Sequence, residues 1–389
     1  MHLTREEERI LDGEYGWACQ TCMRILVKLG ELYGATKLIP ISSAHISGVS
    51  YKTLGDAAID FLKAITEKNA KVKAFSTLNP SSIDPHLTDK LPRNLVEKQF
   101  EILKLYGKMG VKLSLSCTPY YEYIPSKNSN LAWAESSAVV YANSVLGAWT
   151  NREGAPSALA SAIIGKTPNY GVHKPENRKP NIIIDVSFQP ENEVEYGALG
   201  YHIGEIVKDK IPLIRGLKNP SLDELKQLGA ALASSGMTNM FHYKETPKLN
   251  EKLEKITVEK HEINSVIEKL SSSKREKPDM IFIGCPHCSL EEIKFLAKLL
   301  EGKKINSKIE FWVCVSKHVK KQEKKSIELI ERSGVKVLTD TCAVVTWTRR
   351  LGVERIMTNS VKAAHYLPTM NKAEVFLSST KNCVRTACE

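Results

Sequence analysis

The stretch Val111-Lys112-Leu113-Ser114-Leu115-Ser116-Cys117-Thr118-Pro119 decides the fold class of this 389-residue chain. Its alternation predicts a strand over 111–116, with Cys117 and a proline turn directly after it. Strands predicted over 35–41 and 72–76 also end in polar loops, and helices are expected from Thr53 and over 91–109. Such alternation predicts an α/β fold with mostly parallel sheets flanked by helices.

The last third repeats this alternation. The elements expected there are strands over 280–283, 309–315, 335–338, 355–357 and 374–377 and helices over 289–301 and 318–333. In the middle, a strand is expected over 181–186, a glycine-punctuated turn over 196–201 and a helix over 220–235. We therefore expect an N-terminal α/β region (1–245), a helical Lys/Glu-rich connecting segment (246–278) and a C-terminal α/β domain (279–389).

Residues 116–156 concentrate polar side chains more densely than a core requires. Glu135, Ser136 and Ser137 are expected to contact a substrate. Asn151 and Arg152 are expected either to grip a carboxylate or phosphate, or to form a structural ion pair with Glu153.

Three of the nine cysteines share one placement. Cys117, Cys285 and Cys342 each follow a predicted strand, and ligands of parallel α/β sheets bind at the carboxyl ends of strands. Three thiolates from separate loops would leave one corner of an iron–sulfur cube open, and an open iron is a Lewis acid. The alternative is that all three are inert buried thiols. The other six cysteines are left out of the site.

Two further loops and two side chains are candidates. The Gly48-Val49-Ser50 turn is expected either to receive an anion at a helix start or to be a plain N-cap formed by Ser50, and Asn79-Pro80 plays a similar part. Lys362 also starts a helix, where a cation gains nothing from the helix dipole, which favours a role at the substrate. His45 is expected to be a proton carrier or a hydrogen-bonded core histidine.

The composition excludes several classes. The net charge is +11, but the basic residues are spread out and lack interleaved aromatics, which argues against nucleic acid and suits an anionic substrate. No apolar run approaches the roughly 20 residues of a membrane span, and the acidic N-terminus does not resemble a signal peptide. A cytoplasmic protein is expected.

The chain resembles the aconitase X family over nearly all of its length. The segments that carry this resemblance are Ser43–Gly48, Cys117–Tyr120, Ala134–Ser144, Thr150–Gly154, Gly284–His287, Asp340–Cys342 and Asn359–Tyr366. One departure is Ser47, where many members have an aspartate.

The resemblance implies an iron–sulfur cluster of the 4Fe-4S type with one open iron, held by Cys117, Cys285 and Cys342. It also implies dehydration of a hydroxy acid, with Glu135, His45 and Lys362 as catalytic candidates. Two activities are known in the family: dehydration of 5-phosphomevalonate to trans-anhydromevalonate 5-phosphate in an archaeal mevalonate pathway, and dehydration of cis-3-hydroxy-L-proline. The first is expected here.

No swivelling domain follows Glu389, so the chain resembles the large part of a split enzyme. We expect a separate small subunit that carries the domain and the general base. The alternative of another class is a non-catalytic metal- or nucleic-acid-binding protein on the same fold.

Overall fold

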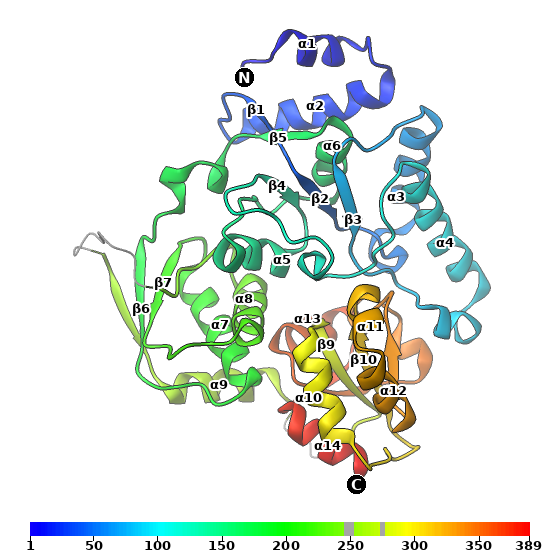
Figure 1. The fold of residues 1–389 in the computed structure, drawn as a ribbon, viewed down its shortest axis with the longest axis vertical. Helices are drawn as coiled ribbons and strands as arrows, with labels where there is room; N and C mark the ends of the chain where they lie inside the picture. The colour runs from blue at the N-terminus through cyan, green and yellow to red at the C-terminus, as the bar shows by residue number, and fades with distance from the viewer. Residues whose placement is uncertain (245–252, 273–276) are drawn as a thin grey trace.

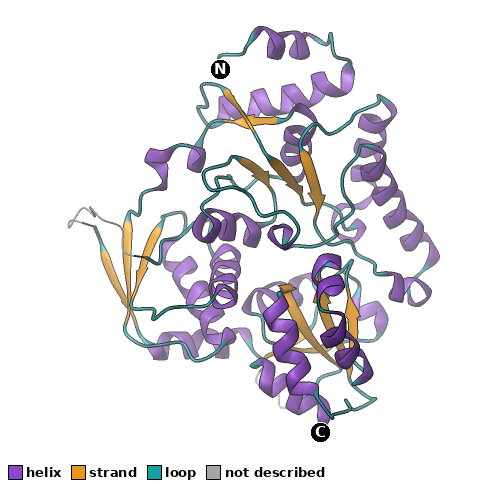
Figure 2. Cartoon of the chain, viewed as in Figure 1, coloured by secondary structure: helices purple, strands orange, loops and turns teal. Residues whose placement is uncertain are grey.

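The computed structural model describes residues 1–244, 253–272 and 277–389. Three all-parallel sheets, each with its own helices, occupy three regions of the molecule (Figure 1). Figure 2 shows helices around the strands of the first and third regions, whereas the strands of the second region lie at the left edge of the molecule with their helices on one side. The α/β fold with parallel sheets flanked by helices is therefore confirmed. None of the described helices combines the length and apolar character that a bilayer span requires.

The first region is built on a three-stranded sheet of order β3-β2-β4, with an antiparallel pair β1-β5 beside it. Its strands are β1 (Leu38–Pro40), β2 (Ser43–Ile46), β3 (Phe75–Leu78), β4 (Leu131–Trp133) and β5 (Lys166–Pro168). Its helices are α1 (Arg5–Asp12), α2 (Trp17–Leu32), α3 (Tyr51–Glu67), α4 (Arg93–Lys108), α5 (Ser136–Tyr141) and α6 (Ala155–Ile164). The apolar faces of α2, α3, α4 and α6 share one core with β2 and β3.

One strand prediction in this region is wrong and another is only partly confirmed. The central strand is β2, which lies in the segment expected to be a loop, whereas 35–41 contributes only the peripheral β1. Residues 111–116 form no strand: Lys112 makes an isolated bridge to Thr77, and Leu115 takes a φ of 51°. The segment still runs beside β3, because the Ser116 amide donates to the Leu78 carbonyl at 3.0 Å. The alternating sequence pattern correctly indicated an extended backbone, but it could not indicate that the segment lacks the continuous strand pairing of a β-sheet.

The second region has the sheet order β7-β6-β8. Its elements are β6 (Ile182–Val186), α7 (Glu193–Val207), β7 (Pro212–Arg215), α8 (Leu222–Ser235), β8 (Lys255–Val258) and α9 (Lys260–Leu270). The turn expected over 196–201 is wrong, because these residues lie within the helix α7. Gly200 instead lets α7 pack closely against the backbone of α8, since an added Cβ would lie 2.0 Å from the Leu228 carbonyl oxygen.

The expected connecting segment 246–278 falls partly outside the described residues, at 246–252 and 273–276. Its described part holds the helix α9 and also β8, which pairs in parallel with β6.

The third region is a five-stranded parallel sheet of order β11-β10-β9-β12-β13. Its strands are β9 (Met280–Cys288), β10 (Glu310–Val315), β11 (Lys336–Leu338), β12 (Arg355–Thr358) and β13 (Glu374–Leu377). Its helices are α10 (Leu290–Leu300), α11 (Lys317–Gln322), α12 (Lys324–Arg332), α13 (Val361–Asn371) and α14 (Thr380–Cys388). Apolar clusters cover both faces of this sheet. The expected strands are confirmed, while the helix expected over 318–333 is broken at Glu323.

Candidate functional site

A cavity of about 220 Å³ lies where the first and third regions meet. Its lining residues are Asn79, Pro80, Cys117, Glu135, Ser136, Cys285, Cys342, Val344, Val345, Lys362, Tyr366 and Met370. Eight of these are candidates chosen from the sequence, and the two that are farthest apart in the chain, Asn79 and Lys362, are more than 280 residues apart.

The three candidate cysteines all reach this cavity. Cys117, Cys285 and Cys342 are buried, with 6%, 5% and 7% of their surface exposed. Cys117 follows an irregular segment instead of a strand, and Cys285 lies within β9, so the strand-end placement holds only for Cys342, after β11. Convergence therefore arises from the junction of the two regions and not from a shared position at strand ends.

Burial raises the pKa of all three thiols, to about 12 for Cys285. Such thiols ionise only when a positive charge binds them, and a metal centre supplies that charge. In the described ranges, no three His, Cys, Asp or Glu side chains are grouped closely enough to hold one metal ion. A cluster makes a different demand, because each thiolate binds a different iron and the sulfurs stand farther apart. Three thiols facing one cavity fit a cluster better than a single ion.

His287 connects two of these cysteines. Its backbone amide donates to Cys117 Sγ at 3.3 Å, and its ring Nδ1 lies 3.0 Å from Ser116 Oγ. Its carbonyl lies 3.5 Å from Nζ of Lys226, a lysine of α8 with 2% exposure. Lys226 is also paired with the partly exposed Glu292, so a buried lysine and its counter-charge lie next to the segment that carries Cys285. The sequence analysis did not select Lys226, because one lysine in an amphipathic helix gives no sign of burial.

Glu135 and Lys362 form an ion pair beside the cysteines. Lys362 Nζ contacts Glu135 Oε1, and Asn79 Nδ2 donates to Glu135 Oε2 at 2.9 Å. Burial acts to raise the pKa of Glu135, but the Lys362 charge and the hydrogen bonds outweigh it and hold that pKa at about 2. Burial likewise opposes ionisation of Lys362, but Glu135 raises the lysine pKa above its usual value. Both groups are therefore charged at neutral pH.

His45 and Ser137 contact the residues around this ion pair: His45 contacts Asn79, and Ser137 contacts Glu135. His45 is fully buried, with Nδ1 2.8 Å from Thr77 Oγ1 and Nε2 3.3 Å from Asn79 Oδ1. Burial lowers its pKa to about 4, so it is a neutral core histidine at pH 7. Ser137 donates to Glu135 Oε1 at 3.1 Å. Both side chains orient cavity residues without lining the cavity.

The Gly48-Val49-Ser50 turn does not line this cavity in the described structure. Gly48 has a φ of 73° and is packed against Ala155, where a Cβ would lie 2.6 Å from the alanine Cβ. Ser50 stands at the N-cap position of α3 but makes no capping bond, and its hydroxyl instead donates to the Val345 carbonyl at 2.9 Å. The turn therefore contacts the loop after Cys342, which does line the cavity.

Asn151 and Arg152 have backbone partners. Asn151 bonds the Tyr170 carbonyl and the Val172 amide, both at 3.0 Å. Arg152 donates to the carbonyl of Ala233 at 2.8 Å, near the end of α8. Neither residue lines the cysteine cavity, and Glu153 bonds Ser157 and Thr167 instead of Arg152. In this structure both side chains hold loops and a helix end together.

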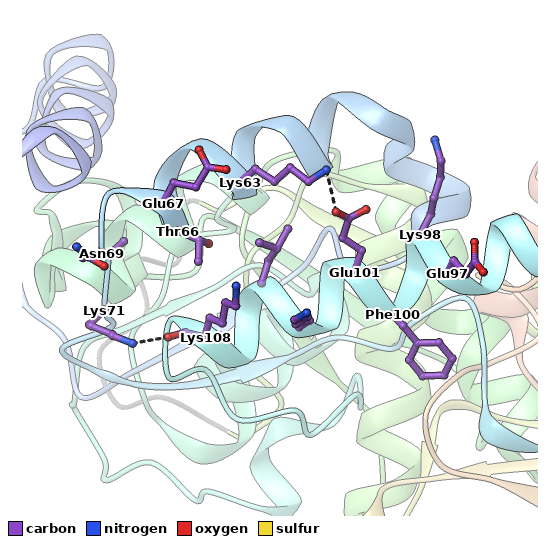
Figure 3. Close-up of a pocket in the computed structure, with 13 residues that line it drawn as sticks. Lys63, Thr66, Glu67, Asn69, Lys71, Glu97, Lys98, Phe100, Glu101 and Lys108 are labelled. Atoms are coloured by element: carbon purple, nitrogen blue, oxygen red, sulfur yellow. Dashed lines mark hydrogen bonds and ion pairs between the residues drawn. The ribbon is translucent and has the colours of Figure 1, made fainter.

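A larger cavity lies elsewhere, between α3 and α4 (Figure 3). It measures about 1040 Å³ and is lined by interleaved lysines and glutamates. Its charges pair at the surface: Lys63 meets Glu101 at 2.8 Å, and both side chains are more than a third exposed. It contains none of the candidate residues. It is a solvated groove between two helices.

Models of three aconitase X domains match the chain: the first domain over residues 1–176, the second over 180–268 and the third over 278–389. These ranges coincide with the regions built on the three parallel sheets.

Relatives of known name match over the whole length. The phosphomevalonate dehydratase large subunit of Methanocaldococcus jannaschii is 48% identical, over 99% of this chain and 100% of that protein. The cis-3-hydroxy-L-proline dehydratase of Hypocrea jecorina is 32% identical, over 100% of this chain but 69% of that protein.

A solved structure agrees. The crystal structure of Thermococcus kodakaraensis aconitase X in its holo-form is 44% identical, covers 100% of both chains and superposes with a TM-score of 0.93. The chain belongs to the aconitase X family.

Proposed function

We propose that this chain is the large subunit of a hydro-lyase that dehydrates (R)-5-phosphomevalonate to trans-anhydromevalonate 5-phosphate in an archaeal mevalonate pathway. The observation that carries the proposal is the meeting of three buried thiols and the Glu135–Lys362 pair at one cavity. Five archaeal relatives named as this large subunit match over 94–100% of the chain, whereas the hydroxyproline dehydratases extend well beyond it. Length and identity together favour the phosphorylated substrate.

Cys117, Cys285 and Cys342 would hold an iron–sulfur cluster of the 4Fe-4S type. Bound there, it supplies a Lewis acid that makes a hydroxyl a better leaving group. The His287 amide, which faces Cys117 Sγ, would stabilise negative charge on that sulfur.

Lys362 is the positive group of the cavity and would bind a substrate carboxylate or phosphate. Glu135 fixes the lysine ammonium and orients Asn79 through its second oxygen. Because its pKa is held at about 2, Glu135 carries no proton at neutral pH and is a weak base. Proton removal from the carbon beside the carboxylate is therefore assigned to a group outside this set.

That group would lie on a small subunit, which the names of the relatives imply. The partner would carry the swivelling domain and cover the cavity, forming a heterodimer or a larger assembly in the cytoplasm. A cavity of about 220 Å³ is smaller than typical complete ligand sites, which is expected if a partner forms the other wall.

The test is turnover by the anaerobically purified complex of both subunits. Loss of the tertiary hydroxyl of (R)-5-phosphomevalonate, followed by NMR, is expected. Turnover of cis-3-hydroxy-L-proline in its place would overturn the substrate assignment. A complex that contains iron but converts neither compound would overturn the reaction class.

A further inference from the structure

The loop that follows Cys342 is fixed by three side chains that lie outside it. Four successive carbonyls, those of residues 343–346, all accept hydrogen bonds from these side chains. The bonds are Asn371 Nδ2 to Ala343 O (2.8 Å) and Val344 O (3.1 Å), Ser50 Oγ to Val345 O (2.9 Å), and Lys52 Nζ to Thr346 O (2.6 Å) and Val344 O (3.3 Å). The loop itself lines the cavity through Val344 and Val345. Its conformation is thus set by contacts from elsewhere in the fold.

Lys52 is the centre of this arrangement. Besides the two carbonyls, its ammonium donates to Asn371 Oδ1 at 2.5 Å, which links it to the second donor of the set. Lys52 is the second residue of α3, where the helix dipole disfavours a cation. It is half-buried, and burial lowers its pKa to about 8.

The position is unfavourable for a lysine that only fills space. A partly buried ammonium whose recorded partners are neutral oxygens costs free energy, and an apolar side chain would avoid that cost. What the ammonium adds is three directed donors that reach three acceptors at once.

The contacts cross between two family domains. Ser50 and Lys52 belong to the first domain, which also carries Cys117, whereas Cys342 and Asn371 belong to the third. Lys52 therefore fixes the loop of one cysteine relative to the region that carries another.

We propose that Lys52 is a positioning residue for Cys342, holding its loop, together with Ser50 and Asn371, at the geometry that a metal centre shared with Cys117 requires. The inference rests on the proposed ligand role of Cys342. Lys52 itself does not line the cavity and is not assigned to the chemistry.

The test compares Lys52→Met with Lys63→Met in the full-length, metal-free chain. Lys63 lies on the same helix but forms an exposed pair with Glu101, so it controls for loss of a lysine. Iodoacetamide labelling of Cys342, Cys117 and Cys285 is followed by mass spectrometry. In Lys52→Met we expect Cys342 to react about ten- to a hundredfold faster, because hydrogen bonds from a charged group contribute that factor to a local opening equilibrium. Cys285 should react as in the wild type.

A merely structural role would give a different pattern. Equal acceleration at all three cysteines, or unchanged labelling of Cys342, would overturn the proposal. If Lys52→Met does not fold, Lys52→Gln and Asn371→Ala can replace it, because they remove fewer contacts. In these variants labelling of Cys342 should again be accelerated selectively, but by a smaller factor.

A second readout uses the reconstituted holoprotein. Iron loss to a chelator should be about tenfold faster in Lys52→Met than in Lys63→Met, since one ligand loop opens more often. If Cys342→Ser retains its iron while Lys52→Met still exposes Cys342, the ligand assignment fails and the loop-positioning role stands. If Cys342→Ser loses its iron but Cys342 in Lys52→Met is labelled as slowly as in the wild type, the ligand assignment stands and the loop-positioning role fails.

Discussion

The cysteine cavity and the groove between α3 and α4 differ in how their charges are held. The groove is larger, about 1040 Å³ against about 220 Å³, but its lysines and glutamates meet as exposed neighbours on two adjacent helices. In the cavity, Lys362 and Glu135 are buried and 227 residues apart in sequence. Exposed pairs contribute little free energy, whereas a buried pair becomes costly when one partner is lost. Paired buried charge, and not volume, therefore distinguishes the candidate site from the groove.

The largest contrast is expected among the cysteines. Cys117→Ser or Cys342→Ser should abolish dehydration, a loss of more than about a thousandfold, because an alkoxide is a poor substitute for a cluster thiolate. Cys314→Ser, at a fully buried cysteine of β10 that does not line the cavity, should retain most of the activity. Steady-state assays of the two-subunit complex measure this. Equal losses in all three variants would remove the distinction between site and core.

Removing one partner of the buried ion pair comes next. Lys362→Met leaves Glu135 as an unpaired buried carboxylate, so we expect the free energy of unfolding to fall by about 3–5 kcal/mol and kcat by at least about a hundredfold. Denaturant unfolding and steady-state kinetics provide the measurements. The double variant Lys362→Met/Glu135→Gln should recover much of the stability but none of the activity. Failure to recover stability would show that the pair is not coupled as described.

Acidification should lower the free energy of unfolding, because the buried His45 resists protonation in the folded state. The folded-state pKa of His45 is lowered to about 4 from an ordinary value of 6.5, so the unfolded chain binds the proton first and stability falls as pH drops through this window. This histidine alone should remove about 2 kcal/mol between pH 7 and pH 5. Comparing unfolding of the wild type with His45→Gln isolates the effect. Identical pH slopes would mean that His45 is charged or exposed.

Arg152 is expected to contribute to stability and not to substrate binding. Arg152→Met removes donors to the end of α8, so we expect a loss of about 1–3 kcal/mol in the free energy of unfolding. The KM for substrate should stay within about twofold, because Arg152 does not line the cavity. A large rise in KM with unchanged stability would restore the substrate role expected from the sequence.

The smallest effect is expected in the groove. Glu101→Gln breaks the exposed pair with Lys63 and should change stability by less than about 0.5 kcal/mol, with no change in kcat. A matched thermal unfolding scan and assay are sufficient. A loss of activity would identify the groove as a second functional region.

The sequence predicted most elements of the third region because its strands are mostly apolar and alternate with amphipathic helices. It failed at β2 and over 111–116, where short polar segments depend on partners distant in the chain. The cysteines and Lys362 were recognisable because thiols and a lysine at a helix start have few structural uses. Lys226 was missed, since nothing local distinguishes a buried lysine within a helix from a surface one. Lys52 was missed although it also starts a helix, because its acceptors on Val344, Thr346 and Asn371 lie 292 to 319 residues away in the chain.

The most direct test compares two cysteines of the same strand. Cys285 and Cys288 are both buried in β9, but only Cys285 lines the cavity. Iron and acid-labile sulfide would be measured in anaerobically purified Cys285→Ser and Cys288→Ser chains, beside the wild type. The account predicts that Cys288→Ser keeps both at wild-type levels and that Cys285→Ser loses them. Retention in Cys285→Ser with loss in Cys288→Ser would contradict it.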